Sequence, residues 1–339
     1  MTAPSRGREC DASSRPVILG VVGDSAAGKT TITRGLVRAL GEDYVSHICT
    51  DDYHRFDRKQ RAELGITPLH PDCNYLDIIA QHLANLHRGE AILKPVYRHQ
   101  DGTFGPPVYF EPGRFTVIEG LLGYYLPEMR DMYDVRVYLN PPEKMRREWK
   151  VQRDCTRRGY TTDEVLAELD RREPDSASFI RPQRLYADML VSFMPPSGDG
   201  GDPAHLDAEL TLRDGLPHPD LAPFVQEDGA ENGLTLVEHD GERLLRIPGR
   251  MDPDRAAAIE EAIWAGMHFA VHLRQRRLGE FTVGTQLYRS ESLALVQLLI
   301  LYHLVTAKAA IALGGDGVRA AAPKREPAQA AVSVGTASA

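Results

Sequence analysis

The sequence has few cysteines, no excess of basic residues and no apolar segment of signal-peptide length at its start. Its four cysteines, Cys10, Cys49, Cys73 and Cys155, show no Cys-x-x-Cys spacing. This argues against a zinc ribbon or a disulfide framework and indicates a reducing compartment. Residues 1–15 are rich in Ser, Arg and Gly, so we expect a disordered leader, no export and a cytoplasmic location.

An excess of positive charge is also missing, because 40 Lys and Arg stand against 48 Asp and Glu, a net charge of −8. An acidic surface repels nucleic acids and anionic membranes, so we expect neither as a partner. The one long apolar run, Ser292–Leu313, contains Gln297, His303 and Lys308. These polar residues favour a buried helix over a membrane span.

Residues 16–198 alternate short apolar runs with amphipathic stretches. This pattern predicts an α/β fold with a mostly parallel sheet flanked by helices. After a Gly/Asp/Pro-rich linker, residues 204–314 predict a C-terminal α+β extension packed on that core. It contains a hairpin turning at Asp240-Gly241 and helices over Pro253–Arg277 and Glu291–Leu313. Residues 315–339 have the composition of a disordered tail.

The stretch GDSAAGKTT follows the first apolar run and matches the pattern G-x-x-x-x-G-K-[ST]. In such a loop, glycines turn backbone N–H groups onto phosphate oxygens, lysine reaches the outer phosphates and the hydroxyl meets Mg²⁺. Chance matches occur, but here a strand precedes the loop and a helix follows, as an anion site requires. We therefore predict a P-loop NTPase fold in which ATP is bound by Gly23, Asp24, Ser25, Ala26, Ala27, Gly28, Lys29, Thr30 and Thr31.

Charged residues follow two further predicted strands. The loop TDDYHRFDR, Thr50–Arg58, contains aspartates, a histidine and arginines. Ligands of open α/β sheets collect at the carboxyl ends of strands. The loop can supply a carboxylate that takes a proton from an acceptor hydroxyl and cations for an acceptor phosphate; a polar surface loop is the alternative. Glu119 ends another strand, where it could hold Mg²⁺ or act as a helix N-cap acid.

The basic stretch KMRREWKVQRDCTRRGYTT contains Gly159, a helix breaker, near its end. On a helix, Arg146, Lys150, Arg153 and Arg157 share one face. This indicates a lid that brings cations over the transferring phosphoryl group, with a solvated charged face as the alternative. The stretch Lys94–Pro107 is bounded by Pro and Gly and is either an acceptor-binding loop or only a hairpin.

Together with VIEGLLG and EPDSASFIRPQRLYADM, these stretches resemble successive blocks of the phosphoribulokinase/uridine kinase family over residues 17–196. The segments LRDGLPHPDL and YRSESLALVQLLILYHL resemble the extension of its longer, cyanobacterial and plant-like phosphoribulokinase class. The resemblance implies ATP and Mg²⁺ as cosubstrate and cofactor, and phosphorylation of ribulose 5-phosphate to ribulose 1,5-bisphosphate in the Calvin cycle. It also implies a homodimer.

The same resemblance assigns roles by motif. Asp51 becomes the base that deprotonates the C1 hydroxyl, and Thr30 and Glu119 become the metal site. Lys29, Arg153 and Asp154 join Asp51 as catalytic residues, and Arg158 serves the nucleotide phosphates. With the loops described above, the predicted acceptor-binding residues are His54, Arg55, Arg58, Tyr97, His99 and Lys150.

The resemblance has one departure and two rivals. Many relatives of the longer class have a cysteine in the phosphate loop that forms a regulatory disulfide, whereas this chain has Ala27 there and retains only Cys49. We therefore expect no such thiol switch. The first rival is uridine kinase or another small-molecule kinase of the same family. Uridine kinase shares the loop and the lid, but its acceptor has no phosphate to use the cations near Asp51. A nucleotide-dependent switch would not need that base, and no N-K-x-D guanine motif is found.

Overall fold

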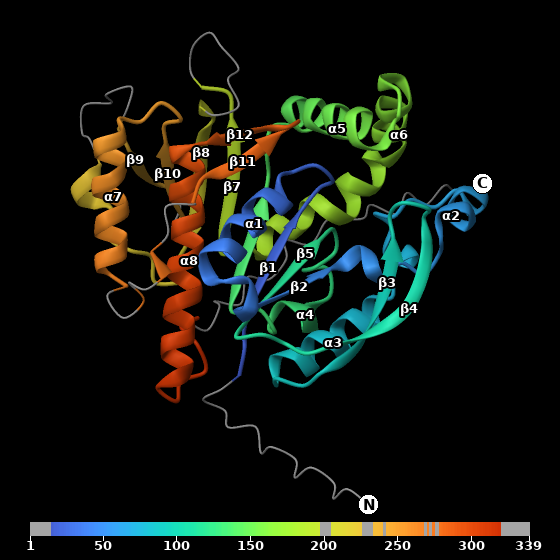
Figure 1. Ribbon diagram of the computed structural model, residues 1–339, viewed down its shortest axis with the longest axis horizontal. Coiled ribbons are helices and arrows are strands. Elements are labelled where there is room, and N and C mark those ends of the chain that lie inside the picture. Colours follow the sequence, from blue (N-terminus) through green and yellow to red (C-terminus); the bar gives the residue numbers. More distant parts are fainter. Residues whose placement is uncertain are drawn as a thin grey trace, which may run out of the picture.

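The computed structural model describes residues 15–196, 205–225, 233–239, 242–267, 270, 273–274 and 278–319. Among these residues, eight strands form one sheet in the order β2-β5-β1-β6-β7-β8-β10-β9 (Figure 1). The first five strands of that order run parallel, and the other three continue the sheet antiparallel. The predicted α/β fold with a mostly parallel sheet is confirmed. The strands are β1 (Val17–Gly23), β2 (Val45–Cys49), β5 (Phe115–Gly120), β6 (Val135–Leu139), β7 (Met189–Met194), β8 (Asp207–Arg213), β9 (Thr235–His239) and β10 (Glu242–Ile247).

Two small hairpins and a set of helices surround this sheet. The hairpins are β3 (Ile92–Arg98) with β4 (Thr103–Phe110), and β11 (Glu280–Val283) with β12 (Gln286–Arg289). The α-helices are α1 (Lys29–Leu40), α2 (Arg58–Leu64), α3 (Leu76–His87), α4 (Pro127–Arg130), α5 (Glu143–Arg158), α6 (Thr162–Asp175), α7 (Pro253–Ala265) and α8 (Glu291–Ala312). Short helical turns are η2 (Glu42–Tyr44), η3 (Thr50–Tyr53), η4 (Pro71–Cys73), η5 (Ser176–Ile180), η6 (Arg181–Tyr186) and η8 (Ala222–Phe224).

The central strand β1 is buried along its whole length, and its side chains alternate between two hydrophobic cores. Val17, Leu19 and Val21 belong to the core that contains α1, α7 and α8. Ile18 and Val22 belong to the core that contains α3. Because side chains point to opposite faces along a strand, a continuous apolar run fits a strand covered by helices on both faces. The loop that follows β1 is thereby held on a rigid base.

The apolar helix α8 is long enough and apolar enough to cross a membrane, but it packs inside the first core. Figure 1 shows it beside α1. The buried Gln297 side chain donates to the Thr31 carbonyl (3.1 Å) and accepts from the Gly279 N–H (2.9 Å). The predicted buried helix is confirmed, and it ends one residue earlier than expected. It ties the C-terminal extension to the helix that carries the phosphate loop.

The predicted helix over Pro253–Arg277 is too long. α7 ends at Ala265, and the N–H of Gly266 donates to the Ala262 carbonyl as the helix closes. Glycine is a poor helix former, so Gly266 ends the helix within an otherwise helical pattern. Residues 268–269, 271–272 and 275–277 lie outside the described residues. The predicted turn at Asp240-Gly241 lies outside them too, although β9 and β10 pair antiparallel as expected.

Both ends of the described chain are held by buried aspartates. Arg15 donates to both carboxylate oxygens of Asp134 (2.8 and 3.1 Å). Arg319 donates to both carboxylate oxygens of Asp188 (2.7 and 2.8 Å) and to the Asp134 carbonyl (2.9 Å). A buried carboxylate needs a cationic partner. The expected limits of the leader and the tail therefore shift, because Arg15 and residues 315–319 are part of the described fold.

Candidate active site

The phosphate-binding loop joins the buried end of β1 to the start of α1. Gly28 has φ 97°, and a Cβ at Gly23 would lie 2.6 Å from the Leu139 carbonyl oxygen. Both positions therefore require glycine. Ala26 has φ 66°, a conformation that costs energy for a residue with a Cβ. The loop is thus sharply turned, with the N-terminus of α1 next to it, as the sequence predicted.

Lys29 is the first residue of α1, and its side chain folds back over the loop. Its ammonium donates to the carbonyls of Gly23 (2.8 Å) and Asp24 (2.9 Å). Burial lowers the pKa of Lys29, and the negative charges of Glu119, Asp51 and Asp24 oppose this shift. The predicted lysine therefore lies among the carboxylates that follow the neighbouring strands.

Glu119, near the end of β5, is buried beside the phosphate loop. Its carboxylate accepts from the hydroxyls of Thr33 (3.1 Å) and Thr30 (3.4 Å), and His47 Nε2 lies 3.4 Å from it. Burial would raise the pKa of Glu119, but the contacts with His47, Lys29 and Thr33 outweigh burial and lower it. The two predicted metal residues, Thr30 and Glu119, are therefore adjacent.

Asp51 and Asp52 both lie in η3, directly after β2, but their contacts differ. Asp52 accepts from the Lys94 ammonium and from the Tyr97 N–H (2.9 Å). These two contacts hold β3 against the segment that follows β2. The Asp51 carboxylate lies 3.9 Å from His99 Nε2 in the β3–β4 turn.

The electrostatic surroundings keep Asp51 ionised. Burial would raise the pKa of Asp51, but the charges of His54, His99 and Lys29 outweigh burial and lower it. Asp51 is therefore in the ionised form that a proton acceptor requires, and its one ion-pair contact among the described residues, with His99, is long. The geometry thus gives the two neighbouring aspartates different surroundings.

His54 directly follows η3 and is buried. Its Nδ1 lies 2.8 Å from Asn74 Oδ1, and the Asn74 amide nitrogen donates to the carbonyls of Pro68 and His70. The Asn74 oxygen must therefore accept, so His54 carries its proton on Nδ1. Burial lowers the pKa of His54, against the charge of Asp51. A neutral His54 can offer only Nε2 to a ligand.

The two arginines of this loop contact different partners. The Arg55 guanidinium lies over the Tyr75 ring, 5.1 Å from its centroid. Arg58 donates to the His99 carbonyl (2.6 Å), and its backbone N–H donates to the Gly102 carbonyl (2.9 Å). Arg58 therefore stabilises the β3–β4 turn, which places His99 near Asp51.

The stretch 94–107 forms the hairpin β3–β4. Tyr97 is buried, and its ring meets the rings of His54 and His99 edge-on at 5.0 and 5.1 Å. Its hydroxyl accepts from Arg61 (2.6 Å). Tyr97 thus supports the two histidines by packing. Arg61 is not among the predicted site residues, although it follows Arg58 at the spacing of one helix face.

The basic stretch forms α5, and part of its charged face is buried. Lys150 donates to Asp154 (2.6 Å), Arg153 donates to the same carboxylate (2.8 Å), and Arg158 lies 3.6 Å from it. Burial and the charge of Arg153 lower the pKa of Lys150 to about 8. Burial would raise the pKa of Asp154, but Arg153 and Lys150 lower it to about 2. Lys150 and Asp154 are buried, unlike residues of a solvated face, whereas Arg153 and Arg158 are partly exposed. The side chain of Arg157 lies outside the described part.

Asp24 links α5 and α6 to the phosphate loop. Its buried carboxylate accepts from the Ser25 N–H (2.7 Å) and from the Ser176 hydroxyl, and Arg146 lies 3.5 Å from it. Arg146 also donates to the Ser25 carbonyl (2.9 Å). We expected Asp24 in the loop and Arg146 in the lid, but the sequence offered no signal that Ser176 joins them.

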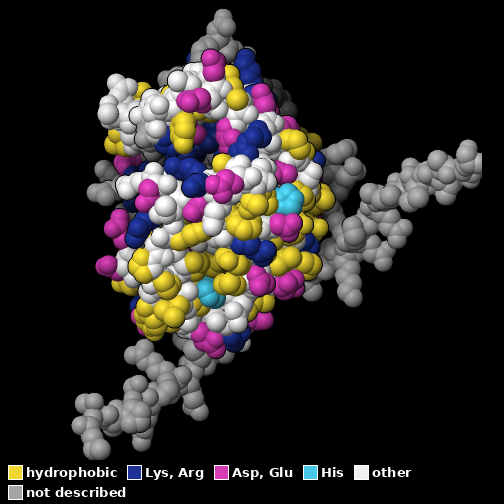
Figure 2. Space-filling view, turned by 90° about the vertical axis from the view of Figure 1, so that its right-hand side faces the viewer, with side chains coloured by type: hydrophobic (Ala, Val, Ile, Leu, Met, Phe, Trp, Pro, Cys, Tyr) yellow, Lys and Arg dark blue, Asp and Glu magenta, His cyan; other side chains and the backbone are white. Residues whose placement is uncertain are grey.

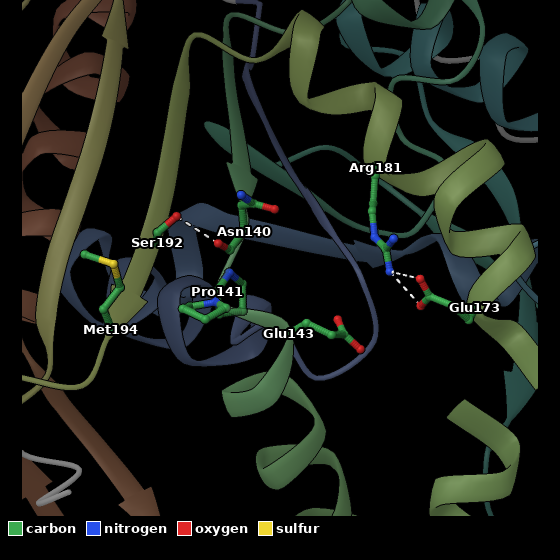
Figure 3. A pocket seen from close by; sticks show the side chains of 8 residues that line it. Asn140, Pro141, Glu143, Glu173, Arg181, Ser192 and Met194 are labelled. Carbon is green, nitrogen blue, oxygen red and sulfur yellow. Dashed lines mark hydrogen bonds and ion pairs between the residues drawn. The ribbon is translucent and has the colours of Figure 1, made fainter. Parts of the chain in front are cut away.

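A cavity of about 410 Å³ opens at the carboxyl ends of β6 and β7, on the β6 side of the phosphate loop (Figure 3). Arg181 donates to both oxygens of Glu173 (2.6 Å each) at one side of it, and Ser192 donates to the Asn140 carbonyl (2.8 Å) at the other. The lining residues are Asn140, Pro141, Pro142, Glu143, Glu173, Arg181, Ser192 and Met194. None of the predicted site residues lines this cavity, although the stretch EPDSASFIRPQRLYADM contains Glu173 and Arg181, because its walls come from separate segments.

The face that carries β3 and β4 combines charge and apolar surface (Figure 2). Lys and Arg side chains gather in its upper part, at the height of α5 and α6. Hydrophobic side chains spread below, and the hairpin exposes Leu93, Phe104, Val108 and Tyr109.

Three comparisons bear on these features. A phosphoribulokinase from Synechocystis sp. is 40% identical over 181 residues, which cover 53% of this chain and 54% of that protein. A uridine kinase from Oceanobacillus iheyensis is 31% identical over 181 residues, covering 52% of this chain and 86% of that protein. A solved phosphoribulokinase from Rhodobacter spheroides shares the fold with a TM-score of 0.55 at 18% identity, covering 77% of this chain and 99% of that one.

The chain spans about half the length of the curated phosphoribulokinases it matches. The family model of the phosphoribulokinase/uridine kinase family matches residues 18–197, more than half of this chain. That range contains the phosphate loop, Asp51, Glu119 and the charged face of α5. The chain therefore belongs to the phosphoribulokinase/uridine kinase family.

Proposed function

We propose that this protein is a kinase that transfers the γ-phosphoryl group of ATP to the C1 hydroxyl of ribulose 5-phosphate, giving ribulose 1,5-bisphosphate for the Calvin cycle. The observation that carries the proposal is a row of groups at the carboxyl edge of the parallel strands. Asp51 follows β2, Glu119 ends β5, Lys29 follows β1, and the cavity lies beyond β6 and β7. Ligands of such sheets bind at this edge.

The strand order supports a division of this edge between two substrates. The phosphate loop after β1 lies between Asp51 on the β2 side and the cavity on the β6 side. A cavity of about 410 Å³ has the size of a small-molecule site. ATP would place its base and ribose there and its phosphates on the loop, with the γ-phosphoryl group directed toward Asp51.

Asp51 is the base in this proposal. Its carboxylate is ionised and faces the β3–β4 turn, while Asp52 is held by Lys94 and Tyr97. As the acceptor hydroxyl attacks, its proton passes to Asp51, which avoids a free alkoxide. The buried cluster of Lys150, Arg153 and Asp154 would orient cations toward the charge that develops on the phosphoryl group.

Thr30 and Glu119 fit a magnesium ion. Both offer oxygen ligands, and Thr30 Oγ1 lies 3.4 Å from Glu119 Oε1. The lowered pKa of Glu119 keeps its carboxylate ionised. When bound with ATP, Mg²⁺ neutralises charge on the phosphates and fixes their orientation.

The charges near Asp51 favour an acceptor with its own phosphate. Lys29, His99 and Arg172 each lower the pKa of Asp51 through their charge. Arg58 and Arg61 hold the segment that carries His99 and Tyr97. A nucleoside such as uridine has no anionic group to use them. Uridine kinase is therefore the second candidate. It is supported by the uridine kinase from Oceanobacillus iheyensis, because the match covers 86% of that protein.

An ADP-release assay with ATP and Mg²⁺ tests the acceptor. Ribulose 5-phosphate, uridine and pantothenate are compared at equal concentration, and the product is identified by mass. We expect turnover with ribulose 5-phosphate alone, and Lys29→Met reports the background. Turnover with uridine and none with ribulose 5-phosphate would replace the proposed acceptor.

We also propose a cytoplasmic homodimer, which rests on the likeness to the longer class of the family. Light scattering on the purified full chain measures the assembly, and a mass near that of one 37.6 kDa chain contradicts it.

A further inference from the structure

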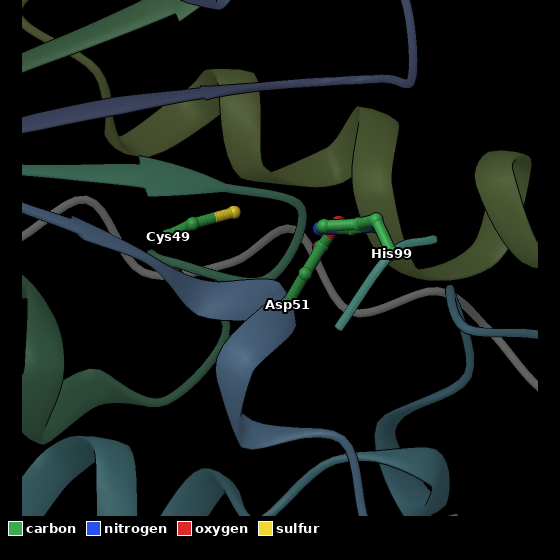
Figure 4. Close-up of side chains that lie close together, drawn as sticks. All are labelled: Cys49, Asp51 and His99. Atoms are coloured by element: carbon green, nitrogen blue, oxygen red, sulfur yellow. The ribbon is translucent and has the colours of Figure 1, made fainter. Parts of the chain in front are cut away.

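Three potential metal ligands meet beside the phosphate loop, and Figure 4 shows them together. Cys49 is the last residue of β2, Asp51 lies in η3, and His99 lies in the β3–β4 turn. One ligand atom from each, the Cys49 thiol sulfur, a carboxylate oxygen and an imidazole nitrogen, lies within 4.8 Å of the other two. They come from two segments about 50 residues apart, so the fold creates this cluster.

The donor set suits a soft or borderline cation rather than magnesium. Thiolate, imidazole and carboxylate are the three ligand types that zinc combines, and zinc keeps a fourth position for water when three protein groups bind it. Magnesium prefers oxygen ligands. The adjacent Thr30 and Glu119 therefore offer magnesium a better site, and the two ions would not compete for the same groups.

The geometry needs only a small closure. Tetrahedral bonds of zinc to sulfur and nitrogen separate ligand atoms by about 3.5 Å. His99 can supply the movement, because its side chain is half exposed and lies in a turn. Cys49 is held in the β2–β5 ladder and Asp51 lies in η3, and both side chains are less exposed than His99.

Nearby negative charge also favours a cation. Cys49 pairs with Glu119 across the β2–β5 ladder, and Asp51 and Asp52 follow in η3. A divalent ion that displaces the thiol proton would be attracted by these carboxylates.

We propose that Cys49, Asp51 and His99 bind Zn²⁺ and that the bound ion inhibits the kinase. Zinc would occupy the carboxylate oxygen that accepts the proton of the acceptor hydroxyl. The inhibition rests on the proposed function, whereas the binding does not.

Binding is tested on the metal-free full chain, without nucleotide. Calorimetry with ZnCl₂ should show one site, and Co²⁺ should give a thiolate-to-cobalt charge-transfer absorption. Cys49→Ser and His99→Ala should each weaken zinc binding by about 100-fold or more, beyond the loss typical of an outer-shell partner. Cys49→Ser should abolish the cobalt absorption, and Cys155→Ser, a matched thiol on α5, should leave both unchanged. Equal binding by all variants overturns the site.

Inhibition is then measured with saturating ATP and Mg²⁺, each variant relative to its own rate without zinc. The parent chain and Cys155→Ser should lose activity as zinc is added and regain it with a chelator, and Cys49→Ser should resist. If zinc binds as proposed but phosphorylation continues, the role of Asp51 as the base is wrong. If zinc does not bind, this inference fails and the proposed function stands unaffected.

Discussion

Asp51 and Asp52 are neighbours with the same side chain, but their surroundings give them different tasks. Asp52 is held by a buried lysine of the hairpin, and Asp51 faces the turn with a lowered pKa. The difference comes from Lys94, which lies 42 residues further along the chain.

Asp51→Asn should reduce kcat by about 10² to 10⁴ without changing the melting temperature, because it removes only a proton acceptor. Asp52→Asn should instead lower stability by about 1–3 kcal/mol, since the buried Lys94 loses its partner. Rates and thermal unfolding of both variants provide the measurement. An Asp51→Asn variant that keeps its kcat would remove this residue as the base.

The pair Ala27 and Cys49 determines the response to oxidation. Ala27 is buried in the phosphate loop and cannot form a disulfide. We expect equal activity after oxidised and reduced dithiothreitol, measured with excess Mg²⁺ and a zinc-selective chelator so that zinc binding is excluded. A reversible loss that Cys49→Ser prevents would reveal another thiol partner.

At the scale of elements, α8 packs against the start of α1. The first turn of α1 carries Lys29 and Thr30, and Gln297 of α8 donates to the Thr31 carbonyl of the same turn. Gly35 leaves room for the Gln297 side chain, because a Cβ there would lie 2.1 Å from Gln297 Nε2. The C-terminal extension therefore supports the helix of the phosphate loop.

Gly35→Ala should lower stability by about 1–3 kcal/mol, because overpacking outweighs the helix propensity that alanine gains. Arg34→Ala, at an exposed position of the same helix, serves as the control and should change little. Denaturant unfolding of both variants measures the effect. A Gly35→Ala protein as stable as the parent would mean that α8 can shift away from α1.

On the scale of the whole molecule, the two ends of the described chain meet through Asp134 and Asp188. Arg319 supplies three hydrogen bonds to this place. Asp134 and Asp188, which directly precede β6 and β7, are thus bound by a residue at the C-terminal end of the described chain.

Arg319→Ala should destabilise the protein by about 1–3 kcal/mol, because Asp188 keeps Arg136 but loses a bidentate partner. A chain that ends at Gly314 should lose as much, and one that ends at Arg319 should match the full chain. Thermal unfolding compares the three. Equal stability of all three would show that this contact contributes nothing.

Acid should weaken the fold through the pair His218 and His303, whose ring nitrogens lie 2.9 Å apart. Burial lowers the pKa of His218, and burial with the charge of His218 lowers the pKa of His303. The unfolded chain therefore binds protons first, so stability is complete above the ordinary histidine pKa of about 6.5 and falls as the pH decreases below it. Melting temperatures between pH 8 and pH 5 measure this loss, and His303→Gln should reduce its slope.

The sequence alone determined the parts of this protein that depend on local pattern. The glycine spacing and the flanking strand and helix defined the phosphate loop, and the period of the apolar runs defined the parallel strands. The polar residues of Ser292–Leu313 indicated a buried helix. These features follow from contacts within a few residues, so they can be read along the chain.

Only the tertiary structure decided which charged groups meet. Asp24 binds Ser176, 152 residues away, and Asp52 rather than Asp51 binds Lys94. The walls of the cavity and the partners of Arg319 also come from distant segments. Local periodicity contains no information about such pairs, because they form when separate elements pack against one another and bury their charges together.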